Sequence, residues 1–246
     1  MHLVFLSLLI ILLAVESVAT ALLEKKNKAV VVTEKIRCRN YCRTIAVLWG
    51  FVLAVFIMCL MGHIGFEDIG LRPISFKYNA WFTAVILILS GLSLALFLYQ
   101  TIRLLTSEKT KEEAKKLDTG EGVSQWLPRT KKEKWLFSLL SLSAGACEEI
   151  IYRGFLVFLL LAIFPGIPLY LLVLIPSVVF GIGHLYQGLQ GIIKTGVFGV
   201  LFMCLVLVTD SLILAMLLHF LLDFSSTFIF SEEEAGAHTG DSSHRL

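Results

Sequence analysis

A series of long apolar blocks, separated by charged stretches, constrains this chain more than any other feature. A block of roughly 18–20 apolar residues is the length that a helix needs to cross a hydrocarbon layer about 30 Å thick. Hydrophobic residues make up 57% of the 246 positions, above the about 45–50% of soluble domains. No alternating strand pattern with turn signals is present. The sequence therefore predicts an all-α, polytopic transmembrane helical bundle of about seven spans, within a range of six to eight.

The apolar blocks give the positions of the spans. We expect them at residues 3–23, 44–65, 80–102, 135–164, 168–185, about 190–209, and 211–230. The fourth block is too long for one perpendicular span, so it is either an interfacial piece (135–144) running into a span (145–164) or a tilted helix. The first block lacks the positive n-region of a signal peptide, which favours a retained first span over a cleaved leader.

Two basic stretches, residues 24–43 and 103–134, flank the apolar blocks and predict the topology. Lysine and arginine near span ends stay on the cytoplasmic side, so both loops and the C-terminus are expected in the cytoplasm of a multi-pass protein of the plasma membrane. The basic residues do not interleave with aromatics as in a nucleic-acid groove, so no nucleic-acid partner is expected. We expect three segments: N-terminal spans and loops (1–134), a catalytic bundle (135–230) and a disordered polar tail (231–246).

Charged side chains inside the apolar blocks are the candidates for function, because each costs about 2.5–3.5 kcal/mol at mid-bilayer on insertion scales. The first group is Glu148, Glu149 and Arg153 in the fourth block. On a helix, Glu149 and Arg153 are i, i+4 neighbours that can pair, while Glu148 projects about 100° away. Glu148 is then left free to act as a general base. The alternative is a structural ion-pair knot that holds helices together.

Two further groups lie in later blocks. His184 follows Phe180 at a predicted helix end, where a lone histidine is more often a satisfied interfacial residue than a catalyst. His219 and Asp223 share one face of the last span at i, i+4 spacing. Either Asp223 orients His219, or both converge on a substrate, water or metal, or they form a buried structural pair.

Each of these polar groups needs a partner in lipid, and the economical solution is one shared, water-containing site. The set fits peptide hydrolysis, which needs a carboxylate to take a proton from water, a histidine to position that water, and donors for the oxyanion. No GxSxG or HExxH motif is present, so water is favoured over a side-chain nucleophile as the attacking group.

The three groups resemble the motifs of the CPBP family, which comprises CAAX proteases and bacteriocin-processing (Abi-type) enzymes. The family's EExxxR, FxxxH and HxxxN/D motifs correspond here to Glu148 to Arg153, Phe180 to His184, and His219 to Asp223, in the family's order. The resemblance covers about residues 130–226. It implies a helical intramembrane endopeptidase in which Glu148 activates water with help from His184. His219 and Asp223 would line the oxyanion side, and Arg153 would orient Glu148 and Glu149.

One position departs from the pattern of the prenyl-protease branch, which typically has Asn where this chain has Asp223. An ionised carboxylate only accepts hydrogen bonds, whereas an amide can donate one. Asp223 is therefore either protonated, or orients His219, or binds a metal. The cofactor is unknown: a divalent metal stays open, although no standard zinc spacing is present.

The expected activity is hydrolysis of a peptide bond in a membrane-associated protein or peptide, such as a prenylated C-terminus or a peptide precursor. The bilayer and that substrate are the expected partners. Two alternatives remain open: a non-catalytic immunity or regulatory factor that binds a peptide in the same site, and a proton-coupled transporter, since intramembrane Glu, Asp and His also serve proton relays.

Overall fold

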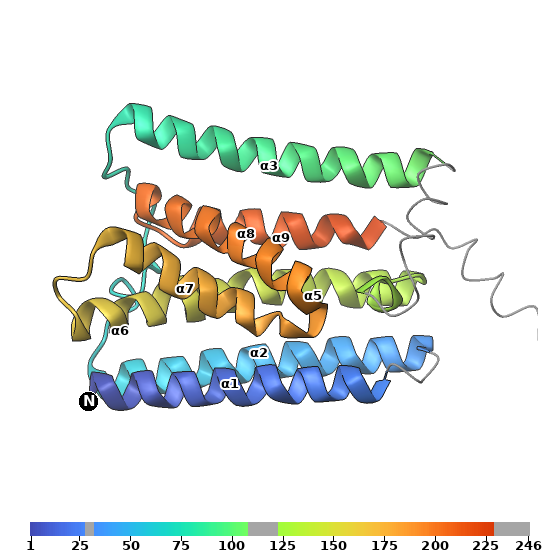
Figure 1. Ribbon diagram of the computed structural model, residues 1–246, viewed down its shortest axis with the longest axis horizontal. Coiled ribbons are helices and arrows are strands. Elements are labelled where there is room, and N and C mark those ends of the chain that lie inside the picture. The colour runs from blue at the N-terminus through green and yellow to red at the C-terminus, as the bar shows by residue number, and fades with distance from the viewer. Residues whose placement is uncertain (28–31, 108–122, 229–246) are drawn as a thin grey trace, which may run out of the picture.

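The computed structural model describes residues 1–27, 32–107 and 123–228. Figure 1 shows long helices running back and forth beside one another. The predicted disorder of residues 231–246, and the histidines that they contain, lie outside the described residues. Within the described part of the chain no strand is present, so the predicted all-α bundle is confirmed.

The N-terminal half contributes three long helices. They are α1 (His2–Asn27), α2 (Glu34–Gly62) and α3 (Ala80–Thr106), and a 3₁₀ turn, η1 (Val123–Trp126), precedes the C-terminal half. The side chains of Thr33 and Asn79 cap α2 and α3 by accepting hydrogen bonds from backbone N–H groups of the first turn. Such caps satisfy donors that have no partner inside the helix.

The C-terminal half forms the remaining helices. In chain order they are α5 (Lys131–Glu149), the π-helical turn η2 (Ile150–Phe155), α6 (Leu156–Ile163), α7 (Leu169–Gly183), the 3₁₀ turn η3 (Leu185–Gln187), α8 (Gly188–Thr209), α9 (Ile213–Ser225) and the 3₁₀ turn η4 (Ser226–Phe228). A capping box begins α5, because Thr130 and Glu133 each accept from the other's backbone N–H.

One predicted boundary differs from the structure. The stretch 24–43 is not all loop: α1 continues to Asn27, and α2 begins at Glu34 directly after its Thr33 cap. The low hydropathy of residues 24–43 had suggested a loop, but the Thr33 cap and the charged first turn of α2 favour a helix there. The fourth block is helical from Lys131 to Ile163, and its hydrogen-bond register changes only in η2.

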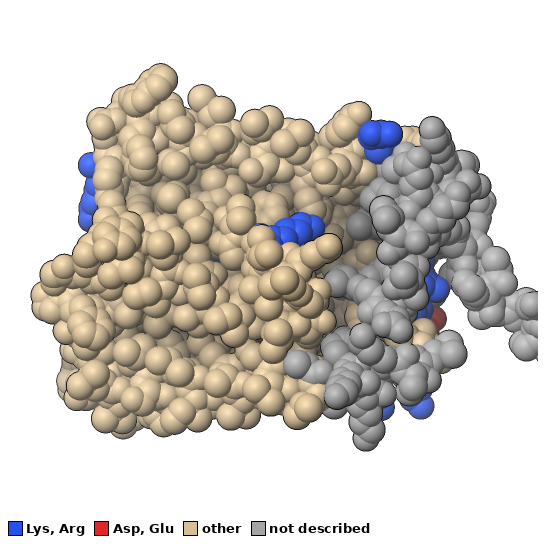
Figure 2. Space-filling view, in the orientation of Figure 1, with Lys and Arg blue, Asp and Glu red and all other residues tan. Residues whose placement is uncertain are grey.

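Within the residues that the structure describes, four helices are long and apolar enough to cross a membrane: His2–Thr20, Glu34–Gly62, Ala80–Arg103 and Leu185–Thr209. The shorter apolar helices α7 and α9 lie between them in the bundle. Figure 2 shows a flank that is almost entirely neutral, with basic groups at its two ends and one basic group midway along it. This distribution of charge is that of an integral membrane protein.

The catalytic candidates lie on helices that pack closely at glycines. Helix α5 lies against α9 and α2, and α7 lies against α8. A Cβ at Gly145 would lie 2.8 Å from the backbone N of Phe220, and one at Gly181 would lie 2.8 Å from the backbone O of Ile192. Helices α7 and α8 thus approach each other closely at Gly181.

At both ends of the bundle, ion pairs connect the N-terminal half of the chain with the C-terminal half. At one end Arg37 of α2 forms a buried ion pair with Glu133 of α5, with 2.6 Å between Arg37 Nε and Glu133 Oε1. At the other end Arg72 and Lys77, from the loop between α2 and α3, both pair with Asp210 in the turn between α8 and α9. We call this second group the Asp210 cluster (Arg72, Lys77 and Asp210).

Candidate active site

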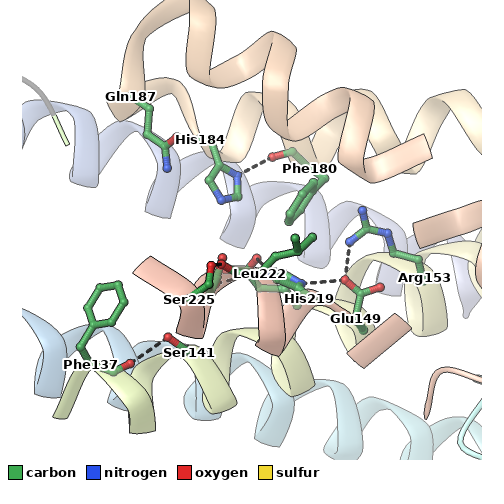
Figure 3. Close-up of polar contacts among 12 residues, drawn as sticks. Phe137, Ser141, Glu149, Arg153, Phe180, His184, Gln187, His219, Leu222 and Ser225 are labelled. Atoms are coloured by element: carbon green, nitrogen blue, oxygen red, sulfur yellow. Dashed lines mark hydrogen bonds and ion pairs between the residues drawn. The ribbon is translucent and has the colours of Figure 1, made fainter. Parts of the chain in front are cut away.

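Glu149 is the anchor of the site and joins two distant parts of the sequence. Its Oε1 accepts a hydrogen bond from Arg153 Nη1 at 2.9 Å and another from His219 Nδ1 at 2.9 Å. Figure 3 shows the carboxylate lying between these two side chains. All three residues are buried. The predicted Glu149–Arg153 pair is therefore present, and it also fixes the ring of His219 on α9.

The EExxxR segment continues into a π-helical turn. In η2 the backbone N–H of Leu156 bonds to the carbonyl of Ile151, five residues earlier. Single π turns inside α-helices are rare and occur frequently at functional sites. Every residue from Ile150 to Phe155 is buried, so the turn lies in the interior of the bundle, directly after Glu149.

Arg153 is held by aromatic rings as well as by Glu149. Its guanidinium carbon lies 4.2 Å from the ring centroid of Phe180 and 5.2 Å from that of Phe202. Within the described residues, its Nε and Nη2 have no hydrogen-bond partner. Contact of the cation with two ring faces compensates part of the cost of burying it. Arg153 is thus fixed in place and neutralises Glu149.

The imidazole of His219 lies close to three carboxyl groups, those of Glu148, Glu149 and Asp223. Because Glu149 accepts at Nδ1, that nitrogen carries a proton. Its Nε2 lies 3.7 Å from Glu148 Oε2 and 3.6 Å from Asp223 Oδ2. A carboxylate ion only accepts, so the arrangement is satisfied when a proton is shared among Nε2 and these two carboxyl groups. The imidazole that approaches Glu148 is that of His219.

His184 is oriented by its own motif. Its Nδ1 donates to the backbone O of Phe180 at 2.9 Å, which leaves Nε2 of the neutral ring as an acceptor. Its ring packs edge-on against the Phe180 ring, 4.7 Å between centroids, and stacks on Tyr186. The structure thus joins His184 to the other five candidates through Phe180, rather than through a direct polar contact with Glu148.

The ring of Phe180 contacts four other side chains, and the FxxxH motif alone did not predict these contacts. It contacts Arg153, and it packs edge-on against Tyr152, His184 and His219. The residue is 2% exposed. A signal was present in the sequence, because the i, i+4 spacing of Phe180 and His184 places both on one helix face. The partners on α5 and α9 depend on tertiary packing.

Glu16 of α1 is a further acidic residue in an apolar helix that the sequence motifs did not identify. Its Oε1 accepts from the hydroxyl of Thr20 at 2.8 Å. Helix α1 packs on η3 and α7. The cost of a charge within an apolar span would have identified it.

No metal ligand set is gathered in the part of the chain that the structure describes: no group of three or more His, Cys, Asp or Glu could hold a metal ion there. In the geometry described, Glu149 is engaged by Arg153 and His219, and the imidazole of His219 separates it from Asp223. These residues therefore form a hydrogen-bonded, charge-compensated group.

Comparison with protein families gives one match. Residues 130–225 match the family model described as type II CAAX prenyl endopeptidase Rce1-like. No curated protein and no solved structure matches the chain. The matched segment runs from the cap of α5 to the end of α9 and contains all six candidate residues.

Proposed function

We propose, from the match of residues 130–225 to the type II CAAX prenyl endopeptidase Rce1-like family model, that this chain is an intramembrane endopeptidase of that family. The substrate class is a membrane-associated protein or peptide. The observation that carries the proposal is the meeting of Glu148 and His219, 71 positions apart in sequence, with 3.7 Å between Oε2 and Nε2. A base and a proton donor this close together can both reach one water molecule that lies beside them.

Glu148 is the group that activates the water. Its Oε2 has no hydrogen-bond partner among the described residues, so it can accept a proton from a water molecule. Nε2 of His184, an acceptor in the tautomer fixed by Phe180, holds the other water proton and orients the oxygen. The hydroxide then bonds to the carbonyl carbon of the substrate, and the carbonyl π electrons move to oxygen.

His219 stabilises the oxyanion that forms. A proton on Nε2 donates to the negative oxygen, while Nδ1 stays bonded to Glu149. When the tetrahedral intermediate collapses, the carbon–nitrogen bond breaks and Glu148 returns its proton to the leaving amine. Water is thereby divided between a new carboxylate and a new amine, and the site regains its starting state.

Glu149, Arg153 and Phe180 are positioning residues in this scheme. Glu149 fixes the tautomer of His219, Arg153 compensates the charge of Glu149, and Phe180 orients both histidines. Asp223, 3.6 Å from His219 Nε2, holds the proton at that nitrogen between turnovers. This role needs only an acceptor, which an aspartate supplies.

The test is the Glu148→Gln variant, compared with wild-type protein on membrane-associated reporter substrates. We expect cleavage to fall at least about 100-fold, because the base is lost, while membrane insertion and thermal unfolding stay unchanged. The matched control is Glu67→Gln, which changes an exposed glutamate in the loop between α2 and α3. Undiminished cleavage by Glu148→Gln would refute the proposal. Comparing the membrane proteome with active and Glu148→Gln protein identifies the natural substrate.

We also propose that the end of the bundle bearing Arg37 and Glu133 faces the cytoplasm, in the plasma membrane. The lysine- and arginine-rich stretches at residues 24–43 and 103–134 support this orientation. A reporter fused after Leu246 is then cytoplasmic, and an external reporter would reverse the assignment.

A further inference from the structure

Tyr152 carries a buried hydroxyl that the mechanism above does not use. The residue lies in the π turn η2, directly before Arg153, and is 7% exposed. Its hydroxyl makes no hydrogen bond to any residue that the structure describes. A buried polar group without a partner is costly, and a phenol can both donate and accept. The hydroxyl of Tyr152 therefore has a proton to donate to a bound molecule.

Two contacts place this hydroxyl beside the residue that precedes His184. The ring of Tyr152 packs edge-on against that of Phe180, with 5.2 Å between centroids. A Cβ at Gly183 would lie only 3.0 Å from the hydroxyl oxygen, so the oxygen lies against the end of α7 and occupies room that a side chain there would take. His184 is the next residue, and its ring packs against the same Phe180 ring.

The spacing along the chain places Tyr152 on the same helix face as Glu148. The two residues are four positions apart, which is close to one turn of an α-helix and of a π-helix. Tyr152 thus adjoins both groups of the proposed water-binding pair: it follows Glu148 on one face, and its hydroxyl meets the glycine before His184. The hydroxyl lies on the side of the helix where Glu148 and His184 would hold a water molecule.

The other hydroxyl groups near the site are already engaged. That of Tyr186, an exposed residue, accepts from Gln187 Nε2 at 2.9 Å. Three serine hydroxyls donate to backbone carbonyls of their own helices, those of Ser141, Ser177 and Ser225, and Figure 3 shows the bond of Ser141. Glu148 and Nε2 of His184 are acceptors. They can take the two protons of a water molecule, but they offer no donor to its oxygen.

We propose that Tyr152 is a further catalytic residue, whose hydroxyl donates a hydrogen bond to the oxygen of the reacting water. Glu148 and His184 then bind the two water protons, and Tyr152 binds one lone pair. The second lone pair is left to form the bond to the carbonyl carbon. The phenolic proton stays on Tyr152 throughout, so the balance of the reaction is unchanged. The inference deepens the proposed endopeptidase function and rests on it.

The experiment compares Tyr152→Phe, Gly183→Ala and the double variant as full-length proteins in vesicles, with a membrane-associated reporter substrate. Tyr152→Phe keeps the ring and removes only the hydroxyl. We expect kcat to fall about tenfold, the effect of one hydrogen bond, with KM and thermal unfolding unchanged. Gly183→Ala lowers kcat by displacing the hydroxyl, but causes no further loss in the Tyr152→Phe protein. The control Tyr170→Phe, which removes an exposed hydroxyl from α7, keeps the wild-type kcat.

An undiminished kcat in Tyr152→Phe would overturn the inference. So would losses that multiply in the double variant, because they indicate two independent effects on packing.

A spectroscopic measurement tests the same hydrogen bond without cleavage. The difference between the ultraviolet resonance Raman spectra of wild type and Tyr152→Phe isolates the phenol of Tyr152, whose ring bands distinguish a hydrogen-bond donor from a phenol without a partner. We expect the bands of a donor. Bands of an unbonded phenol would overturn the inference. Donor bands in a wild-type protein that cleaves no reporter would support the water site at Tyr152 and refute the proposed catalytic function instead.

Discussion

At the scale of single residues, the cost of placing a charge in lipid was sufficient to find most of the polar candidates. Glu148, Glu149, His219 and Asp223 come from two apolar blocks and converge in the structure. The aromatic partners could not be found in this way. Phe202 is one of 18 phenylalanines, and nothing local shows that it faces a guanidinium; Phe180 was identified only through its spacing from His184.

Arg153→Lys tests the aromatic contribution. A lysine keeps the charge but loses the planar group that lies against Phe180 and Phe202 and bonds to Glu149. We expect kcat to fall about tenfold or more with little change in KM, because His219 loses its fixed support. Cleavage kinetics in vesicles measure this.

The matched control for that variant is Arg103→Lys, since Arg103 also lies over a ring, that of Tyr99 at 6.0 Å, but near the end of α3. It should leave kcat unchanged. Full activity in Arg153→Lys would show that charge alone suffices at this position.

At the scale of elements, sequence patterns located the helices better than their ends. The apolar blocks predicted α7 and α8 within about two residues, whereas α2 begins ten residues before the predicted span, at its Thr33 cap. The π turn η2 could not be predicted, because local propensity does not distinguish an i+5 from an i+4 register. Which of the two registers Ile150–Phe155 adopts depends on the helices that surround this segment.

Gly145→Ala tests the contact between α5 and α9. The added Cβ would lie 2.8 Å from Phe220 N and 2.9 Å from Met216 O, both backbone atoms. The helices must separate, which disturbs the bond between Glu149 and His219. We expect a loss of about 1–3 kcal/mol in stability and at least a tenfold loss of activity, measured by thermal unfolding and by cleavage.

Gly91→Ala is the control, because a Cβ at Gly91 in α3 meets nothing within 4 Å. Alanine has the higher helix propensity, so this variant should be as stable as wild type or slightly more stable. An active, stable Gly145→Ala protein would contradict the assigned packing.

At the scale of the whole molecule, composition predicted the helical bundle but not how its halves meet. The division into segments 1–134 and 135–230 remains a prediction. The structure shows α2 lying against α5, and α3 against α8 and α9. The pair of Arg37 and Glu133, 96 positions apart, could not be inferred, because both residues lie in basic stretches expected to be solvated loops.

This pair makes stability depend on acid. Burial opposes ionisation of Glu133, but the backbone N–H groups of Thr130 and Arg129 and the guanidinium of Arg37 together lower its pKa below the ordinary 4.5. A lowered folded-state pKa gives stability that is fully present above pH about 4.5 and is lost as the pH falls through the folded value. Thermal unfolding in detergent between pH 7 and pH 3 measures this.

Glu133→Gln should cost about 3 kcal/mol at pH 7, because Arg37 is left buried without its counter-ion, and should flatten the acid dependence. Glu34→Gln changes an exposed glutamate at the start of α2 and should reproduce the wild-type curve. An unchanged acid dependence in Glu133→Gln would assign it to other carboxylates.

The packing around the Asp210 cluster is relevant to whether protons can leak across the membrane. A hydrolase inside a bilayer must admit water, and a continuous file of water would carry protons across. Arg72 bonds to Asp210 from the loop that also contains Ile69, and the backbone O of Ile69 lies close to Gly154, the residue after Arg153. The side chain of Leu212 packs on the same glycine. Ile69, Phe155 and Leu212 are at most 1% exposed. A buried apolar layer thus adjoins the site at that end, and under the proposed function it would confine the reacting water to one side of the bilayer.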